Sequence, residues 1–167
     1  VFDDADLTEA VEGAIASKYR NAGQTCVCAN RMFVQSGIHD KFVAALAEKV
    51  AEMKVGDGFE EGVVQGPIID QQGFDKIERH IADATAKGGV VVTGGKPHEK
   101  GGTFYQPTVL TGATRDMQLF SEETFGPVAA LFKFDKEEDA IAAANDTIFG
   151  LAAYFFTKDV SRIFRVS

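Results

Sequence analysis

Two cysteines stand one residue apart near the start of the chain, in the stretch RNAGQTCVC from Arg20 to Cys28. They are the only cysteines among the 167 residues. A thiol acts as a nucleophile when a cation, a base or backbone N–H groups stabilise its thiolate. The polar and flexible residues before Cys26 favour a loop that presents the thiol, whereas a lone cysteine is more often a small buried hydrophobic residue. These residues alone leave both interpretations of Cys26 open.

A metal site has less support from the pattern. Cys26 and Cys28 supply only two ligands, whereas a structural zinc site typically takes four. The three histidines, His39, His80 and His98, are scattered without the spacing of metal ligands. We therefore expect no metal. The chain also contains no P-loop, no G-x-G-x-x-G dinucleotide motif and no Ser-His-Asp order.

A second stretch that could do chemistry is SEETFGP, from Ser121 to Pro127. It precedes an apolar run that predicts a strand. A carboxylate at the entry to a strand can accept hydrogen bonds from sugar hydroxyls, while Phe125 offers an apolar face to a ring. A solvated acidic turn is the competing interpretation.

Composition excludes several classes of protein. Hydrophobic residues make up 45% and charged residues 25% of the chain, as in ordinary globular domains. A net charge of -8 argues against nucleic acid as a partner, because phosphate contacts need clustered Lys and Arg. No apolar run approaches the roughly 20 residues that span a bilayer, and the acidic VFDDADL does not resemble a signal peptide. Two cysteines favour a reducing compartment, so we expect a cytoplasmic location and no membrane partner.

The elements that must position these residues alternate between helix and strand. The spacing of apolar residues predicts a layered α/β domain whose sheet is largely parallel and flanked by helices. Pro107 allows only a broken strand over 104–110, because proline cannot donate to a ladder. We expect helices over 7–20, 39–53, 70–87, 136–146 and 159–167, a buried strand over 90–95, and further strands over 31–35, 127–134 and 151–157.

Several motifs in one order resemble the aldehyde dehydrogenase superfamily over essentially the whole chain. They are GQTC before Val27, QGPIID (65–70), TGG (93–95), EETFGPV (122–128) and FGLAAYFFTKD (149–159). The resemblance implies a three-layer catalytic domain of that family. It also implies that residues 1–167 are a nucleophile-bearing catalytic-domain fragment, without the cofactor domain and the oligomerisation arm of such enzymes. The full-length protein is then expected to be a homo-oligomer.

A finer resemblance is to the succinate-semialdehyde dehydrogenases, carried by ASKYRNAGQTCVCANRMFVQSGIHDKF (16–42). It implies that Cys26 is the nucleophile and that Arg20 binds the distal carboxylate of the substrate, which suits a bidentate guanidinium. Cys28 matches a second cysteine that in some members forms a reversible disulfide with the nucleophile. By the same resemblance, Glu123 binds the nicotinamide ribose and Phe125 packs at that end of the cofactor.

The implied reaction is oxidation of succinate semialdehyde to succinate with NAD or NADP, through a thiohemiacetal and a thioester on the cysteine. The cofactor would be bound mainly by the absent domain, and the general-base glutamate and the oxyanion asparagine would precede Val1, so we expect the fragment alone to be inactive. The alternatives are a dehydrogenase for glutarate semialdehyde or an aliphatic aldehyde, a non-enzymatic relative, and a protein in which Cys26 and Cys28 act mainly as a redox sensor.

Overall fold

Four strands form one sheet in the computed structural model, which describes all residues from Val1 to Ser167. The sheet is largely parallel, which confirms the predicted fold class: the first and third strands each pair in parallel with the fourth, and only the second is antiparallel. The order across the sheet is β1 (Arg31–Gln35), β4 (Val128–Phe134), β3 (Thr108–Thr111) and β2 (Val90–Thr93).

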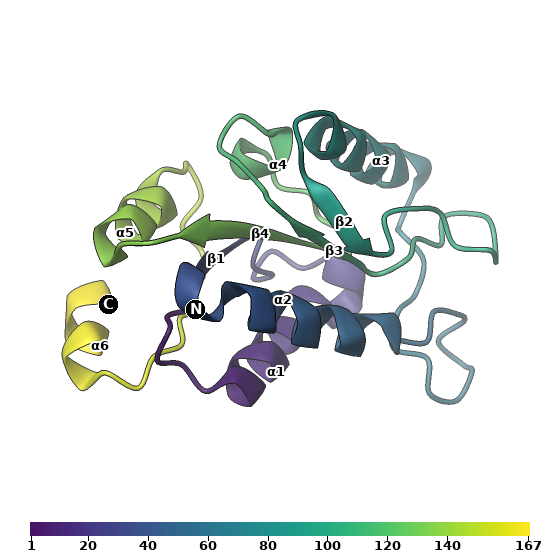
Figure 1. The fold of residues 1–167 in the computed structure, drawn as a ribbon. Coiled ribbons are helices and arrows are strands. Elements are labelled where there is room, and N and C mark those ends of the chain that lie inside the picture. The colour runs from purple at the N-terminus through teal and green to yellow at the C-terminus, as the bar shows by residue number, and fades with distance from the viewer.

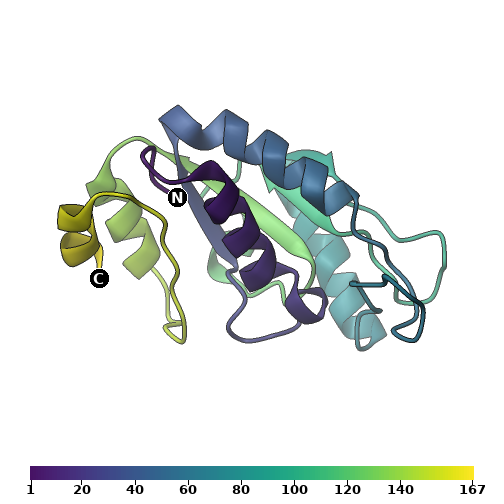
Figure 2. The same ribbon diagram turned by 90° about the horizontal axis from the view of Figure 1, so that it is seen from below.

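Helices cover both faces of the sheet and make the three layers (Figure 1). α1 (Leu7–Lys18) and α2 (Ser36–Ala51) lie side by side on one face, as Figure 2 shows from below. The other face carries the remaining core helices, α3 (Gln71–Ala86), α4 (Gln118–Ser121) and α5 (Glu137–Asn145).

The central strand β4 explains why two cores form. Its side chains alternate between the faces, so Leu131 packs with Phe42 and Leu46 of α2, while Phe132 packs in the cluster that contains Ile77 of α3. Burying each such side chain stabilises the fold by about 1.5–3 kcal/mol. β4 therefore contributes to both cores, and its position fixes where the segments before and after it begin.

Two of the predicted strands differ in the structure. β2 exists, but it is not buried: it forms the edge of the sheet, and Val90 is 57% exposed. The expected strand over 151–157 is wrong, because Val1 already pairs with the outer edge of β1. That segment makes one backbone hydrogen bond, from Phe2 N–H to the Phe156 carbonyl (3.1 Å), and is otherwise attached by side chains: the Tyr154 hydroxyl donates to the Val27 carbonyl at 3.0 Å and the Thr157 hydroxyl donates to Asp4 at 2.8 Å.

The predicted helices are confirmed with shifts at their ends. α2 begins at Ser36 rather than His39, and the short α4 was not predicted. Asp6 caps α1 and Asp70 caps α3, each accepting hydrogen bonds from backbone N–H groups of the first turn. None of the helices is long and apolar enough to cross a membrane.

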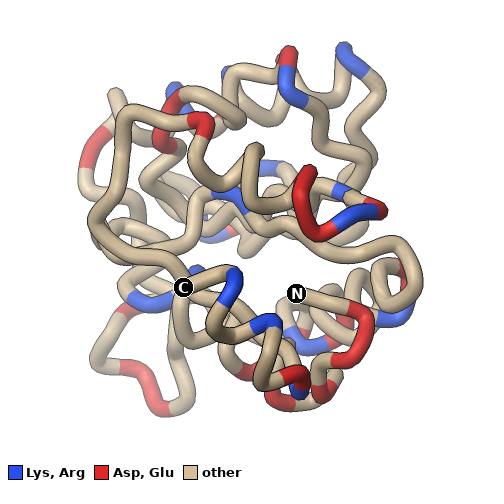
Figure 3. The backbone as a smooth tube through the Cα atoms, turned by 90° about the vertical axis from the view of Figure 1, so that its left-hand side faces the viewer, with Lys and Arg blue, Asp and Glu red and all other residues tan.

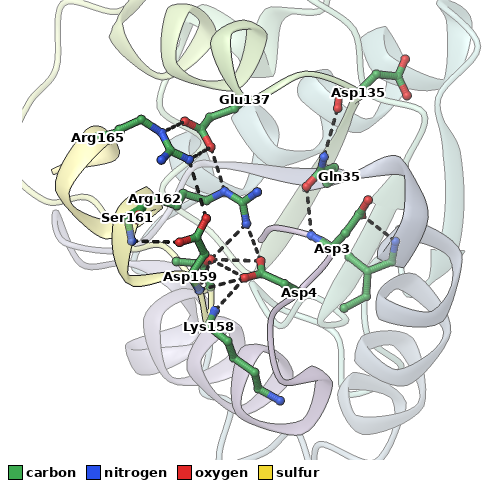
Figure 4. A network of polar contacts seen from close by, with 12 residues as sticks. Asp3, Asp4, Gln35, Asp135, Glu137, Lys158, Asp159, Ser161, Arg162 and Arg165 are labelled. Carbon is green, nitrogen blue, oxygen red and sulfur yellow. Dashed lines mark hydrogen bonds and ion pairs between the residues drawn. The ribbon is translucent and has the colours of Figure 1, made fainter.

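The last helix, α6 (Val160–Val166), buries no residue and is held by charge (Figure 4). Arg162 bonds to Asp4 and, at 2.8 Å, to Glu137, which also accepts from Arg165 at 2.7 Å. The Arg165 and Arg162 guanidiniums lower the pKa of Glu137 to about 2. Both chain ends lie on this charged side of the molecule (Figure 3).

Candidate active site

Cys26 lies in a tight turn just beyond the end of α1. The chain first passes through a short 3₁₀ segment, Arg20–Gly23, in which Asn21, Ala22 and Gly23 have positive φ angles of 51°, 52° and 72°. Cys28 N–H then donates to the Thr25 carbonyl at 2.9 Å, which closes the Thr25–Cys28 turn. Cys26 is exposed and both cysteines are free thiols. The exposure removes the interpretation of Cys26 as a buried hydrophobic residue.

Gln24 fastens this turn to the start of the α3 segment. Its amide donates to the Pro67 carbonyl at 3.1 Å and accepts from Ile69 N–H at 2.8 Å. Both polar ends of the side chain are thus engaged by QGPIID, a motif that is 43 residues away in sequence. Both motifs are visible in the sequence, and the structure shows that hydrogen bonds join GQTC to QGPIID.

The 122–126 loop, between α4 and β4, touches the end of the 3₁₀ segment just before this turn, backbone to backbone. A Cβ placed on Gly23 would lie 2.0 Å from the Gly126 carbonyl oxygen, so only glycine fits there. Phe125 has a φ of 52°, which for a bulky residue costs roughly 1–3 kcal/mol and must be enforced by its surroundings. The GQTC and EETFGPV motifs are therefore in direct contact.

Two side chains from outside hold the 122–126 loop through Thr124. Asn30 accepts from Thr124 N–H at 2.9 Å, and the fully buried His80 bonds to the Thr124 hydroxyl at 3.0 Å. The other ring nitrogen of His80 lies 3.1 Å from the Glu122 carboxylate. Burial lowers the pKa of His80. The sequence does not predict either role, although Asn30 stands in the 16–42 stretch, because the partners of Asn30 and His80 lie 42 to 94 residues away.

Glu123 and Phe125 line one cavity of about 450 Å³ together with Gln24. Lys76 and Arg79 of α3 add two cations to its wall; they are three residues apart and so share a helix face. A half-buried carboxylate can accept hydrogen bonds from hydroxyl groups, a partly exposed phenyl ring can pack on another ring, and the cations can attract phosphate. The wall of this cavity therefore combines a hydrogen-bond acceptor, an aromatic ring and two cations. The helical spacing of Lys76 and Arg79 was the signal by which sequence could have found them.

A buried cation lies beneath the site. Lys18, in the last turn of α1, is only 1% exposed and takes part in none of the ion pairs of the structure. Burial lowers the pKa of Lys18 to about 8, although the nearby Cys28 thiol and Glu123 carboxylate act in the opposite direction. Lys18 is thus within electrostatic reach of both stretches that the sequence singled out.

Arg20 does not line the cavity of Glu123 and Phe125. It is exposed and lines a second cavity, of about 600 Å³, with Tyr19, Lys49 and Gln65. The Cys28 sulfur lies 3.8 Å from the Arg20 carbonyl oxygen, and Cys26 lines neither cavity. No group of three or more His, Cys, Asp or Glu side chains is arranged to hold a metal ion.

Comparison with known proteins defines the family. The profile of the aldehyde dehydrogenase family matches residues 1–167, and the chain belongs to that family. It is 58% identical over 166 residues to succinate-semialdehyde dehydrogenase (NADP(+)) GabD of Escherichia coli strain K12, covering 99% of this chain and 34% of that protein. It is 55% identical over 167 residues to glutarate-semialdehyde dehydrogenase of Pseudomonas aeruginosa, covering 100% of this chain and 35% of that protein.

A solved structure agrees with the fold. The crystal structure of succinate-semialdehyde dehydrogenase from Burkholderia pseudomallei superposes with a TM-score of 0.98 at 57% identity, over 99% of this chain and 34% of that one. The resemblance inferred from the motifs is confirmed. The chain spans about a third of the length of the relatives that it matches.

Proposed function

We propose that this chain is the catalytic domain of an NAD- or NADP-dependent dehydrogenase that oxidises succinate semialdehyde to succinate, with Cys26 as nucleophile. One observation carries the proposal: the exposed thiol of Cys26 stands three residues after Gly23, whose backbone contacts that of Gly126 in the loop carrying Glu123 and Phe125. This contact would hold the segment that presents the thiol next to the loop that lines the cavity. Relatives named for semialdehyde oxidation support the substrate class.

Cys26 would add its thiolate to the aldehyde carbon and form a thiohemiacetal. The backbone N–H of Cys26 donates no hydrogen bond within the chain, so it is available to the oxyanion that forms on the former carbonyl oxygen. Loss of a hydride and the hydroxyl proton from the thiohemiacetal leaves a thioester, and water releases the acid. Replacing Cys26 with Ala should abolish dehydrogenase turnover in the full-length enzyme and leave its thermal unfolding unchanged, because the thiol is exposed.

Glu123 and Phe125 would hold the nicotinamide end of the cofactor. When bound, NAD or NADP supplies the acceptor for the hydride. The half-buried Glu123 carboxylate would accept from the ribose hydroxyls, and Lys76 and Arg79 would lie toward the phosphates. Most of the cofactor would be bound by a domain outside this chain. We therefore propose that residues 1–167 alone do not oxidise aldehydes, and turnover by the purified 167-residue chain would contradict this.

Arg20 would bind the distal carboxylate of the substrate. Lys49 lines the same cavity and adds to its positive charge. A hydrogen bond to a charged group is worth about 1.5–3 kcal/mol. In the full-length enzyme, Arg20→Leu should therefore raise KM for succinate semialdehyde about 10- to 150-fold and leave KM for a neutral aldehyde unchanged. Arg115→Leu, at an exposed arginine paired with Asp146, is the control. An equal loss for both aldehydes would assign Arg20 a structural role.

Glutarate semialdehyde is the second candidate substrate, because a relative of that name is 55% identical. The two differ by one methylene, so kcat/KM for each, measured on the same enzyme, decides between them.

We also propose that the full-length enzyme is a cytoplasmic homo-oligomer.

Cys28 is proposed as a redox partner of Cys26. Both thiols are free, and they lie two residues apart within one turn. A disulfide between them would close a very small ring and so should be easily reduced. It would also remove the nucleophile. Mild peroxide should accept two electrons and two protons from the thiols, so mass spectrometry should show the loss of two hydrogen atoms across Thr25–Asn30, reversed by a thiol reductant. An unchanged mass would refute the proposal.

A further inference from the structure

We infer that Asn30 is a positioning residue: it holds the 122–126 loop in register with the Thr25–Cys28 turn and thereby sets the separation between Cys26 and a ring bound beside Phe125. The inference rests on the proposed function, which makes that separation matter. Asn30 follows Cys26 by four residues and directly precedes β1.

Both polar atoms of the Asn30 amide bond to the opposite segment. The amide nitrogen donates to the Leu119 and Glu122 carbonyls, both at 3.1 Å, and the amide oxygen accepts from Thr124 N–H at 2.9 Å. An asparagine amide offers donors on its nitrogen and acceptor sites on its oxygen, and here both kinds are engaged by one short stretch. One side chain thus joins two segments separated by 89 to 94 residues.

Within the chain backbone, the 122–126 loop is held only at its two ends, where Glu122 N–H donates to the Gln118 carbonyl at 2.9 Å and the Gly126 carbonyl accepts from Val128 N–H at 2.8 Å. Among residues 123–126, only Thr124 donates a backbone N–H hydrogen bond, and Asn30 is its acceptor. Phe125, the next residue, has the positive φ angle. His80 secures the hydroxyl of Thr124 and the carboxylate of Glu122, but it makes no bond to the loop backbone. Asn30 is therefore the only side chain that makes hydrogen bonds to the backbone of this loop.

The next residue, Arg31, contacts α5 and the Phe120 ring independently of Asn30. The Arg31 guanidinium donates to the Ala143 carbonyl at 2.7 Å and lies over the Phe120 ring at 4.9 Å. Arg31 and the contact between Gly23 and Gly126 therefore remain when the Asn30 amide is removed. Loss of Asn30 should loosen the 122–126 loop without unfolding the domain.

A looser 122–126 loop would change the distance between Cys26 and a ring bound beside Phe125. Reacting atoms must approach to about 3–3.5 Å, and a misplacement of about 1 Å can cost about 100-fold in rate. In the full-length enzyme, Asn30→Ala should lower kcat about 10- to 100-fold and raise KM for NAD or NADP, while KM for the aldehyde stays constant. Asn30→Asp keeps the acceptor for Thr124 N–H and loses both donors, so its kcat should lie between those of Asn30→Ala and the wild type.

The control is Asn145→Ala, because that amide donates only to the Ile141 carbonyl within α5. It should leave kcat and both KM values unchanged. A wild-type kcat in Asn30→Ala would overturn the inference, whatever the melting temperature of the variant. A fall in kcat equal in Asn30→Ala and Asn145→Ala would overturn it as well.

A second readout keeps the inference separate from the proposed function. In the 167-residue chain, hydrogen exchange at Thr124 N–H should be markedly faster in Asn30→Ala than in wild type and unchanged in Asn145→Ala. Unchanged exchange at Thr124 would refute the inference even if the full-length enzyme is active. If the wild-type enzyme lacks dehydrogenase activity, the proposed function fails, and the exchange experiment still decides whether Asn30 holds the loop.

Discussion

Lys18 should destabilise the folded chain at neutral pH, and its replacement by Met should stabilise it. Lys18 is 1% exposed on α1, and no carboxylate pairs with its ammonium. Burial lowers its pKa from 10.5 to about 8. That difference corresponds to about 3 kcal/mol by which the folded state disfavours the protonated lysine. Met fills a similar volume without a charge, so at pH 7 Lys18→Met should raise the free energy of unfolding by up to about 3 kcal/mol.

The pH dependence gives the sharper test. Between pH 8 and pH 10.5 the unfolded chain binds the Lys18 proton and the folded chain does not, so the wild type gains stability as pH rises through this window. Lys18→Met lacks that gain. The advantage of the variant should therefore be largest at pH 7 and should shrink steadily toward pH 10.5.

The assay is urea unfolding of wild type and variant at half-unit steps from pH 7 to pH 10.5. Taking the difference between the two proteins cancels the titration of the thiols and other shared groups. Lys49→Met is the control, since Lys49 is 62% exposed and has only a 3.9 Å contact with Glu52; it should change stability little at any pH. A Lys18→Met variant that is less stable than wild type at pH 7, or whose advantage does not depend on pH, would refute the reasoning.

Two further predictions concern the contact between the loops and the charged attachment of α6. Gly23→Ala should lower the free energy of unfolding by about 1–3 kcal/mol more than Gly101→Ala does. Both glycines have a φ of 72°, but only a Cβ at Gly23 would collide with another backbone. Equal melting temperatures for the two variants would show that the contact between Gly23 and Gly126 is loose. Glu137→Gln should lower the melting temperature at pH 7, because the ionised Glu137 carboxylate bonds to two arginines. The difference in melting temperature from wild type should vanish as pH falls from about 4.5 toward 2, where the carboxylate becomes protonated. The exposed, unpaired neighbour Glu138→Gln is the control, and a deficit that persists at pH 2 would contradict the role of the ion pairs.

Local pattern in the sequence was sufficient for much of the architecture. Apolar spacing predicts α1, α2, α3 and α5 because each helix buries one stripe of side chains, and that stripe is visible in the order of residues. The run Val128–Phe134 predicts the central strand because both of its faces are covered. The motifs around Cys26 and Glu123 were equally visible, and they identified the family before any distance was known.

Pairing partners and neighbours across the fold were decided only by the tertiary structure. A run such as 90–95 or 151–157 carries the same apolar signal whether it lies at an edge, in the centre or outside a sheet, because strand position depends on which edges remain free. The burial of Lys18 and the span of the Asn30 amide follow from contacts between segments up to 94 residues apart. The sequence by itself determined which residues could do the chemistry. The tertiary structure decided that the segments carrying Cys26 and Glu123 meet, through the contact between Gly23 and Gly126, since no local preference encodes that contact.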